Sequence, residues 1–255
     1  MKAIIEVGAY DGTDGIALAY KNPQIKVFAF EANPYQINTI KKNKKILEKR
    51  KNIKLKNYII YNYAVSKEDK IKNFYIAKNP RASSLNQVKV NLEKNWAGWK
   101  KVHFDQIKKI KVTSINLKTF CKKKNINKIL YLHLDAQGTD LEILKSLKKN
   151  INSVNEGVIE VAKNNSTAIY KKNHTIKDLK KFFSKKFKIN KIEPNTKLNN
   201  EFNVFFEKKI MTDKRVNKNY NTRYFYRIFN KKKNYKDDFF DLIESLYNRL
   251  FYNIP

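Results

Sequence analysis

The 255-residue sequence predicts an α/β fold built on a doubly wound, mostly parallel sheet. Short apolar runs alternate with helix-like segments through the first 66 residues, and the same alternation resumes near residue 128. Strands that are buried on both faces of a parallel sheet give continuous apolar runs of this kind. The strand, helix, strand order also requires parallel strands joined by right-handed crossovers.

Three buried strands are expected in the first quarter of the chain. They are KAIIEVG (residues 2–8), IKVFAFE (25–31) and YIIYNYAVS (58–66). A first helix follows the opening glycine turn. A second begins after Asn33, a favoured N-cap residue, with Pro34 at its first position.

Residues 67–110 lose this periodicity and are expected to form an irregular insertion on the substrate side, with a hairpin at 70–79. Long irregular segments inside compact domains are often binding loops or lids. The alternation then resumes with two strands, each followed by a helix, and ends with two closing strands. These elements are expected at residues 128–135, 138–149, 153–162, 175–187, 187–194 and 201–209.

We expect the chain to consist of one domain over residues 1–208 and a C-terminal segment over residues 209–255. Between residues 208 and 236, eleven Lys or Arg stand against one Asp, and aromatic residues are interleaved with them. We expect this basic stretch to be a solvated linker. Residues 235–251 are amphipathic and predict a helix that either folds back onto the domain or forms a homodimer interface.

The formal charge of +32 is the strongest feature of the composition. Clustered Lys and Arg bind nucleic acid by neutralising phosphates. Because Lys is plentiful throughout and residues 1–40 carry no basic patch, a nucleic-acid partner is possible but not favoured. No transmembrane run and no signal peptide is found, so a cytoplasmic location is expected. A single Cys121 and three His predict no disulfide and no metal site.

The segment EVGAYDGTDG (residues 6–15) places three glycines between the first strand and the first helix. A glycine turn at this place in a doubly wound sheet binds cofactors that contain adenosine. Glu31 ends the second strand 19 residues after Gly12. A carboxylate at this position can bind both hydroxyls of the ribose.

The glycine spacing separates the two common adenosine cofactors. Gly8, Gly12 and Gly15 depart from the G-x-G-x-x-G of dinucleotide sites, and Asp11 and Asp14 would repel a pyrophosphate on the turn. S-adenosylmethionine has no phosphate and carries a sulfonium and an ammonium, which carboxylates attract. We therefore expect S-adenosylmethionine as the cofactor.

Eight short segments follow one another along about residues 3–208. They are EVGAYDGTDG, FEANP, NYAVS, ASSL, LHLDAQGTDLEILKSL, VIEV, AIY and EFNVFF. In order and approximate spacing, the set resembles the FkbM-type family of class I S-adenosylmethionine-dependent methyltransferases. The resemblance implies a Rossmann-like, seven-stranded sheet whose last strand is antiparallel. It also implies O-methylation of a hydroxyl on a sugar, glycan or natural product.

The resemblance assigns cofactor-binding residues by their position in these segments. They are Glu6, Gly8, Ala9, Gly12, Glu31, Asn33, Asn62, Ala64 and Asp135. Gln137, Gly138 and Asp140 match the same family motif as Asp135. The sequence departs from the family at His133, where many members have lysine.

Three residues are candidates for catalysis. Asp135 ends the fourth strand beside the switch point, where it either acts as general base or holds the cofactor's ammonium. His133 lies two residues earlier on the same side of that strand, and it is either a base or a hydrogen-bonded structural residue. Glu160 lies near the end of the next strand and either orients a substrate hydroxyl or caps a neighbouring helix.

Two alternatives to this O-methyltransferase stay open. An RNA ribose methyltransferase would use the same cofactor site and recruit the basic C-terminal segment. A non-catalytic S-adenosylmethionine-binding module would keep the cofactor motif alone. Within the insertion, Ser83 and Ser84 are expected near the substrate, and Trp96 and Trp99 either stack on a sugar ring or anchor the loop.

Overall fold

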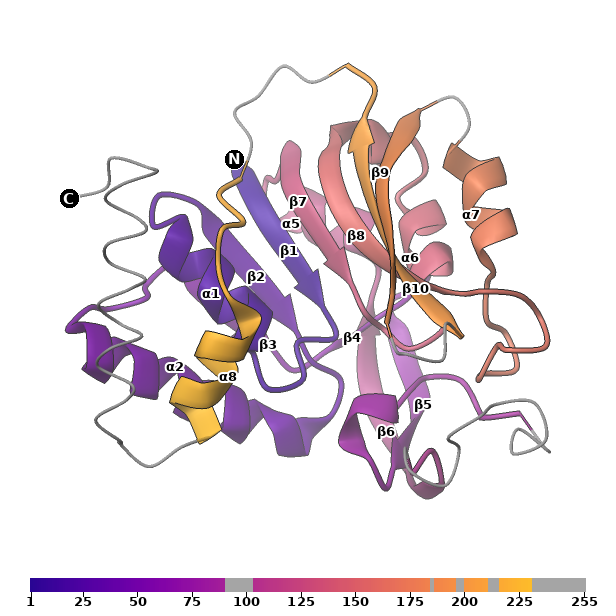
Figure 1. The fold of residues 1–255 in the computed structure, drawn as a ribbon, viewed down its shortest axis with the longest axis horizontal. Coiled ribbons are helices and arrows are strands. Elements are labelled where there is room, and N and C mark those ends of the chain that lie inside the picture. The colour runs from indigo at the N-terminus through magenta and orange to yellow at the C-terminus, as the bar shows by residue number, and fades with distance from the viewer. Residues whose placement is uncertain (90–102, 184–185, 196–199, 211–215, 231–255) are drawn as a thin grey trace.

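A seven-stranded sheet forms the centre of the computed structural model, which describes residues 1–89, 103–183, 186–195, 200–210 and 216–230. The strand order is β3-β2-β1-β7-β8-β10-β9 (Figure 1). The bounds are β1 (Lys2–Val7), β2 (Lys26–Phe30), β3 (Tyr58–Tyr61), β7 (Lys128–Leu134), β8 (Val154–Ala162), β9 (Phe187–Pro194) and β10 (Glu201–Lys208). Only β10 pairs in antiparallel fashion, with β8 on one side and β9 on the other. The predicted Rossmann-like sheet with an antiparallel last strand is confirmed.

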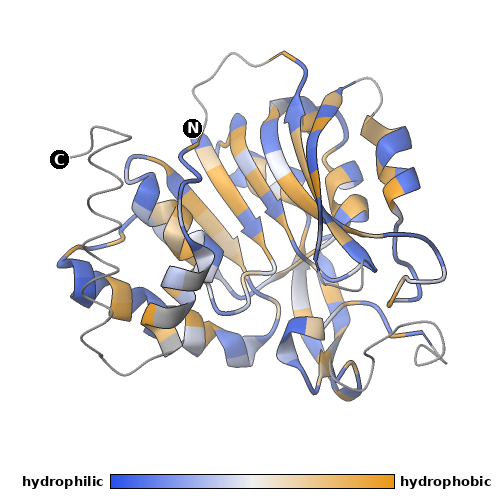
Figure 2. Cartoon of the chain, in the orientation of Figure 1, coloured by the Kyte–Doolittle hydropathy of each residue, from blue (hydrophilic) through white to orange (hydrophobic). Residues whose placement is uncertain are grey.

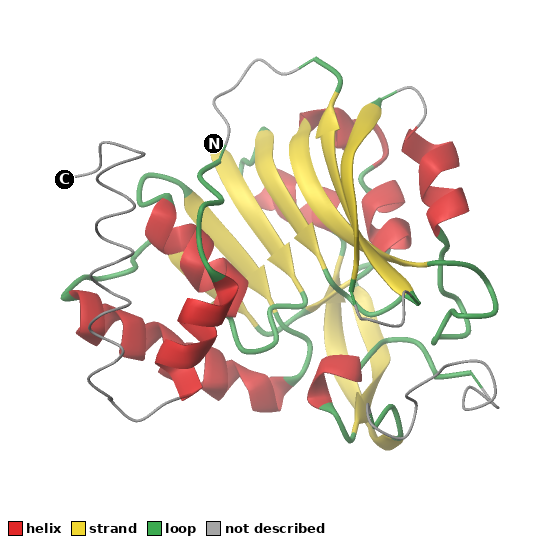
Figure 3. Ribbon diagram, viewed as in Figure 1, coloured by secondary structure: helices red, strands yellow, loops and turns green. Residues whose placement is uncertain are grey.

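Helices cover both faces of this sheet (Figure 3). One face carries α1 (Thr13–Lys21), α2 (Pro34–Lys51) and α8 (Thr222–Asn230), and the other carries α5 (Leu117–Lys123), α6 (Asp140–Ser146) and α7 (Ile176–Phe183). Two 3-10 helices, η1 (Pro80–Ala82) and η2 (Lys148–Ser153), lie in connections. Within the described ranges, no helix has the length and apolar character needed to cross a membrane.

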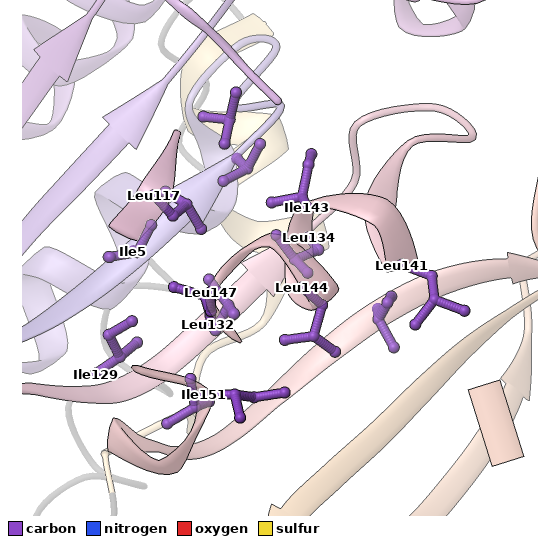
Figure 4. Packing of buried hydrophobic residues seen from close by; sticks show 14 of the residues in the cluster. Ile5, Leu117, Ile129, Leu132, Leu134, Leu141, Ile143, Leu144, Leu147 and Ile151 are labelled. Carbon is purple, nitrogen blue, oxygen red and sulfur yellow. The ribbon is translucent and has the colours of Figure 1, made fainter. Parts of the chain in front are cut away.

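The core follows from the alternation of side chains along each strand. Ile4 of β1 packs with α1 and α2, whereas Ile5 packs on the opposite face. There it joins Leu132 of β7 and Ile143 and Leu144 of α6, all fully buried (Figure 4). Figure 2 shows hydrophobic residues concentrated on the central strands. Burial on both faces explains the continuous apolar runs in the sequence.

A separate three-stranded sheet lies beyond the carboxyl ends of β1 and β7 (Figure 1). Its order is β4-β6-β5, from β4 (Ala64–Val65), β6 (Gln106–Ile115) and β5 (Lys70–Ala77). The predicted hairpin at 70–79 is wrong, because β5 is one strand that pairs with the distant β6. The segment has no glycine turn that would reverse it. The predicted strand at 58–66 is also divided, between β3 of the main sheet and β4 of the small one.

Residues 216–230 pack against the α1–α2 layer, so the predicted solvated linker is wrong for this stretch. Tyr224, Phe225, Ile228 and Phe229 of α8 are buried there. The ring of Phe225 meets that of Tyr20 edge to face, with centroids 6.2 Å apart. The amphipathic helix predicted at 235–251 lies outside the described residues. The domain boundary at residue 208 stays a prediction.

Candidate active site

A cavity of about 480 Å³ opens at the carboxyl edge of the main sheet. It is bounded by the turn after β1, the ends of β2 and β7, the small sheet with η1, and α8. The charged and hydrogen-bonding side chains of its lining include Glu6, Asp11, Asp14, Glu31, Arg81, His133, Asp135, Gln137, Asn195 and Glu201. Open α/β sheets bind ligands at this edge, where neighbouring strands continue in opposite directions. Here that switch point lies between β1 and β7.

The turn after β1 joins the ends of three strands. The amides of Gly8 and Ala9 donate to the Phe30 carbonyl over 2.9 and 3.0 Å. Gly8 has φ +81°, and a Cβ there would lie 1.8 Å from the Asp135 carbonyl oxygen, so only glycine fits. Gly8 and Ala9 line the cavity, whereas Gly12 lies behind it at the N-terminus of α1.

Glu6 supports the turn from within the protein. Its Oε1 accepts a hydrogen bond from the Gly15 amide at 2.7 Å, and its Oε2 accepts one from the Tyr58 hydroxyl at 3.2 Å. Burial, followed by the charge of Asp14, raises the pKa of Glu6 well above its usual value. The carboxyl group therefore anchors α1 to β1 at the edge of the cavity.

Glu31 is buried at the end of β2 and faces the cavity. Its Oε2 accepts a hydrogen bond from the Tyr10 amide and its Oε1 accepts one from the Asn33 amide, each at 2.7 Å. A carboxylate has about four acceptor positions, so about two stay open. Burial raises the pKa of Glu31 to about 7, against the lowering effect of the two amides.

Three other predicted cofactor residues lie near Glu31 with different surroundings. Asn33 is buried and caps α2, where its Oδ1 accepts from the Tyr35 amide at 3.1 Å. The exposed Asn62 donates to the Glu31 carbonyl at 2.9 Å. Ala64 lines the cavity, whereas Asn33 and Asn62 do not.

His133 and Asp135 line the cavity from the end of β7. His133 lies beside Glu6 in the parallel register, and its Nδ1 is buried without a hydrogen-bond partner among the described residues. The Asp135 amide donates to the Val7 carbonyl at 3.0 Å. The Asp135 Oδ1 accepts a hydrogen bond from Gln137 Nε2 at 2.7 Å. The structure therefore brings both residues together at the switch point.

Gln137 connects Asp135 to the predicted catalytic residue Glu160. Its Nε2 lies 2.7 Å from Asp135 Oδ1 and 3.0 Å from Glu160 Oε2, and its Oε1 lies 2.9 Å from the Tyr170 hydroxyl. Glu160 also accepts a hydrogen bond from Asn195 and does not line the cavity. Burial, followed by the charge of Asp135, raises the pKa of Glu160 well above its usual value.

Glu201, which the sequence analysis did not single out, lines the same end of the cavity from the start of β10. It pairs with Ala162 at the end of β8, because β10 runs antiparallel to that strand. Burial, followed by the charges of Asp135 and Asp140, raises the pKa of Glu201 to about 8. The segment EFNVFF begins at this residue, but the segment alone does not place Glu201 at the cavity, since that position depends on the order of strands in the sheet.

Four residues of the segment 67–110 were expected near the substrate or in its binding loop, and the structure describes the two serines among them. Ser83 lines the cavity, but its hydroxyl oxygen accepts from the Ala77 amide at 3.0 Å. Ser84 donates to the Gln137 carbonyl at 2.7 Å and thereby supports the β7 turn. Trp96 and Trp99 lie outside the described residues. In the part of the chain that the structure describes, no group of three or more potential metal ligands is placed to hold an ion.

A family model for the methyltransferase FkbM domain matches residues 6–189, which covers well over half of the chain. The match begins at Glu6 on the cavity and extends into β9. The chain belongs to the FkbM methyltransferase family. Membership confirms the predicted enzyme class and the predicted S-adenosylmethionine cofactor.

Several solved structures are similar to this FkbM methyltransferase at low sequence identity. The FkbM methyltransferase from Methylobacillus flagellatus KT is 11% identical, with TM-score 0.47, over 81% of this chain and 44% of that one. TrmK from M. capricolum, solved with S-adenosyl-homocysteine, is 14% identical, with TM-score 0.43, over 83% and 64%. The structure of a fibrillarin/Nop5p complex is 15% identical, with TM-score 0.42, over 81% of this chain and 72% of that one. The chain thus spans less than two thirds of the first two proteins. No curated protein matches it significantly.

Proposed function

We propose that this FkbM methyltransferase transfers a methyl group from S-adenosylmethionine to a hydroxyl of a sugar, glycan or natural-product acceptor. The observation that carries the proposal is the order of polar groups along the cavity. Glu31 lies at one end, Asp135 and Gln137 lie at the switch point, and Asn195 and Glu201 lie at the other end. Carboxylates and side-chain amides can bind several hydroxyls at once. The first end suits a ribose, and the far end suits a hydroxylated acceptor.

The β1–β2 end of the cavity fits the cofactor. Glu31 keeps open acceptor positions for a ribose diol, and Gly8 and Ala9 allow the ligand to approach the main chain. Ala64 offers a small apolar wall suited to a flat adenine. When bound, S-adenosylmethionine supplies a methyl group on a cationic sulfonium, which is a good leaving group. The carboxylates of the lining attract this cation.

Four of the predicted cofactor residues act indirectly in this proposal. Glu6 and Gly12 fix the start of α1. Asn33 fixes Glu31 by donating its backbone amide to the Glu31 carboxylate, and Asn62 does so by donating its side-chain amide to the Glu31 carbonyl. Their contribution is to preorganise the residues that touch the ligand.

The predicted catalytic residues take separate roles. Asp135 holds the cofactor's ammonium, because it ends β7 directly beside the Gly8 turn. His133 contributes to the cavity wall, while its Nδ1 stays buried and does not reach the ligand. Glu160 is a positioning residue, since it fixes Gln137 and through it Asp135. Methyl transfer depends mainly on placing the acceptor oxygen in line with the breaking bond.

Calorimetry and mass spectrometry test the proposal. We expect binding of S-adenosylmethionine without binding of NAD, and transfer of a trideuteromethyl group to one class in a panel of hexosides, uronides, phenolic glycosides and RNA transcripts. The cofactor part is contradicted if NAD binds and S-adenosylmethionine does not. Methylation of RNA alone would replace the acceptor class with RNA ribose. Cofactor binding without transfer to any class would favour the binding-module alternative.

A further inference from the structure

Glu201 differs from the other acidic residues of the cavity in how its carboxylate is satisfied. Glu6 and Glu31 accept hydrogen bonds from backbone amides, and Asp135 accepts one from Gln137. Asp11 accepts two from Thr13, through its amide and its hydroxyl. The Glu201 carboxylate makes no hydrogen bond and no ion pair with any described residue, although the residue is only 6% exposed. The Glu201 oxygens are not among the fully buried atoms that lack a partner, so they reach the cavity, where water, a ligand hydroxyl or a proton can satisfy them.

The position of Glu201 in the sheet places it at the acceptor end. Along the carboxyl edge, Glu31 follows β2, Gly8 follows β1, Asp135 follows β7, Glu160 lies near the end of β8, and Glu201 begins β10. A cofactor that extends from Glu31 to Asp135 lies across the carboxyl ends of three neighbouring strands, β2, β1 and β7. The next cavity-lining carboxyl group beyond the cofactor is then Glu201, because Glu160 does not reach the cavity.

The charged neighbours of Glu201 come from several elements. The titratable groups that face it are Asp135 of β7, Asp140 of α6, Glu160 of β8 and Tyr170 of the loop after β8. Burial, followed by the charges of Asp135 and Asp140, raises the pKa of Glu201 to about 8. A general base works best when its pKa lies near the working pH, since it is then partly ionised and still basic enough to accept a proton.

We propose that Glu201 is the general base of this methyltransferase and that its carboxylate accepts the proton of the acceptor hydroxyl. The inference rests on the proposed function. As the hydroxyl oxygen forms its bond to the methyl carbon, its proton passes to Glu201. The carbon–sulfur bond breaks with its electron pair staying on sulfur, so the products are a methyl ether, a neutral thioether and a protonated Glu201. Glu201 then releases its proton to solvent through the open cavity.

Carbon-13 NMR of protein labelled at the glutamate carboxyl carbons gives the first test. We expect one signal to titrate near pH 8, to be absent from Glu201→Gln and to persist in Glu193→Gln. Glu193 is a matched control on the neighbouring β9, where it forms an ion pair with Lys191 outside the cavity. Titration of the Glu201 signal in the ordinary carboxyl range overturns the proposal, whether or not an acceptor is known.

Methyl transfer to the panel acceptor that the wild-type protein accepts gives the second test. Glu201→Gln should lower kcat at least 100-fold, as loss of a general base does, and should leave S-adenosyl-homocysteine affinity within threefold. The wild-type kcat/KM should rise with pH up to about 8 and then level off. Undiminished transfer by Glu201→Gln overturns the proposal. Failure of the wild-type protein to bind S-adenosylmethionine would instead contradict the proposed function, and the general-base role of Glu201 would fall with it, whereas loss of transfer confined to Glu201→Gln would leave the proposed function standing.

Discussion

Glu31 shows how one side chain can serve the fold and the ligand together. Its two carboxylate oxygens bind the amides of Tyr10 and Asn33, which fixes the turn after β1 relative to the start of α2. The same oxygens keep open positions toward the cavity. The fixed geometry spares a bound ribose the entropy of ordering the carboxylate.

Substitution of Glu31 tests this double role. Glu31→Ala removes the hydrogen bonds to the diol and leaves two amides without partners. S-adenosyl-homocysteine binding should weaken by about 2–3 kcal/mol, or about 30- to 150-fold. Glu31→Gln keeps one acceptor oxygen and should lose about tenfold. Calorimetry measures both, with Glu193→Gln as a control that keeps full affinity. Affinity of Glu31→Ala within twofold of wild type would show that Glu31 does not contact the ligand.

The sequence predicts residues whose signal is local and misses those placed by topology. Gly8 and Glu31 follow from the spacing of one strand, turn and strand. Glu201 reaches the end of β8, opposite Ala162, because β10 inserts between β8 and β9, and the segment EFNVFF does not by itself encode that order. Gln137 is found by its motif, but its bonds to two carboxylates depend on a turn with φ +54°.

Helix α8 was hidden in the sequence by the Lys and Arg residues around it. Its apolar positions, Tyr224, Phe225, Ile228 and Phe229, recur at helical spacing and cover α1 and α2. Thr222 and Tyr226 of the same helix line the cavity. Its packing therefore supplies part of the wall around the ligand. The pairing of β5 with β6 was missed for a different reason, since it joins segments about 30 residues apart in the sequence.

Truncation of Phe225 tests whether α8 belongs to the folded core. The ring is fully buried, so Phe225→Ala should lower the free energy of unfolding by about 3–5 kcal/mol. Tyr226→Ala should cost less than about 1 kcal/mol, because Tyr226 is 47% exposed and lines the cavity instead of packing in the α1–α2 layer. Urea denaturation followed by circular dichroism gives both values. Equal, small losses would mean that α8 does not pack as described.

The charge of the whole molecule and the charge of its cavity have opposite signs. The chain carries +32, yet the cavity lining has six carboxyl groups and, within the described residues, one arginine, Arg81. The Arg81 guanidinium lies 4.8 Å from the centre of the Tyr10 ring. The net charge of the whole chain bears on its solubility and on its non-specific association with other molecules. The chemistry of the site follows from the local carboxyl groups.

The carboxyl groups of the cavity, together with the buried Asp140 at the start of α6, predict how stability depends on pH. Burial raises the pKa of Glu31 and of Asp140 to about 7 and that of Glu201 to about 8. Between the unfolded pKa values, about 4.5 for Glu and about 3.8 for Asp, and these folded-state values, the folded state binds more protons than the unfolded state, so stability falls as pH rises. The free energy of unfolding of the ligand-free protein should decrease from pH 5.5 to 8.5. Glu201→Gln should remove part of the decrease, on the order of 3 kcal/mol.

Urea denaturation at pH 5.5, 7.0 and 8.5 measures this slope for the wild-type protein, Glu201→Gln and the control Glu193→Gln. The control should keep the wild-type slope, because Glu193 lies outside the cavity in an ion pair with Lys191. S-adenosylmethionine should stabilise the wild-type protein more at pH 8.5 than at pH 5.5, since its cationic groups bind better to ionised carboxylates. Stability that is constant or rises over this range would mean that the cavity carboxyl groups ionise normally, and their proposed roles would then lack an electrostatic basis.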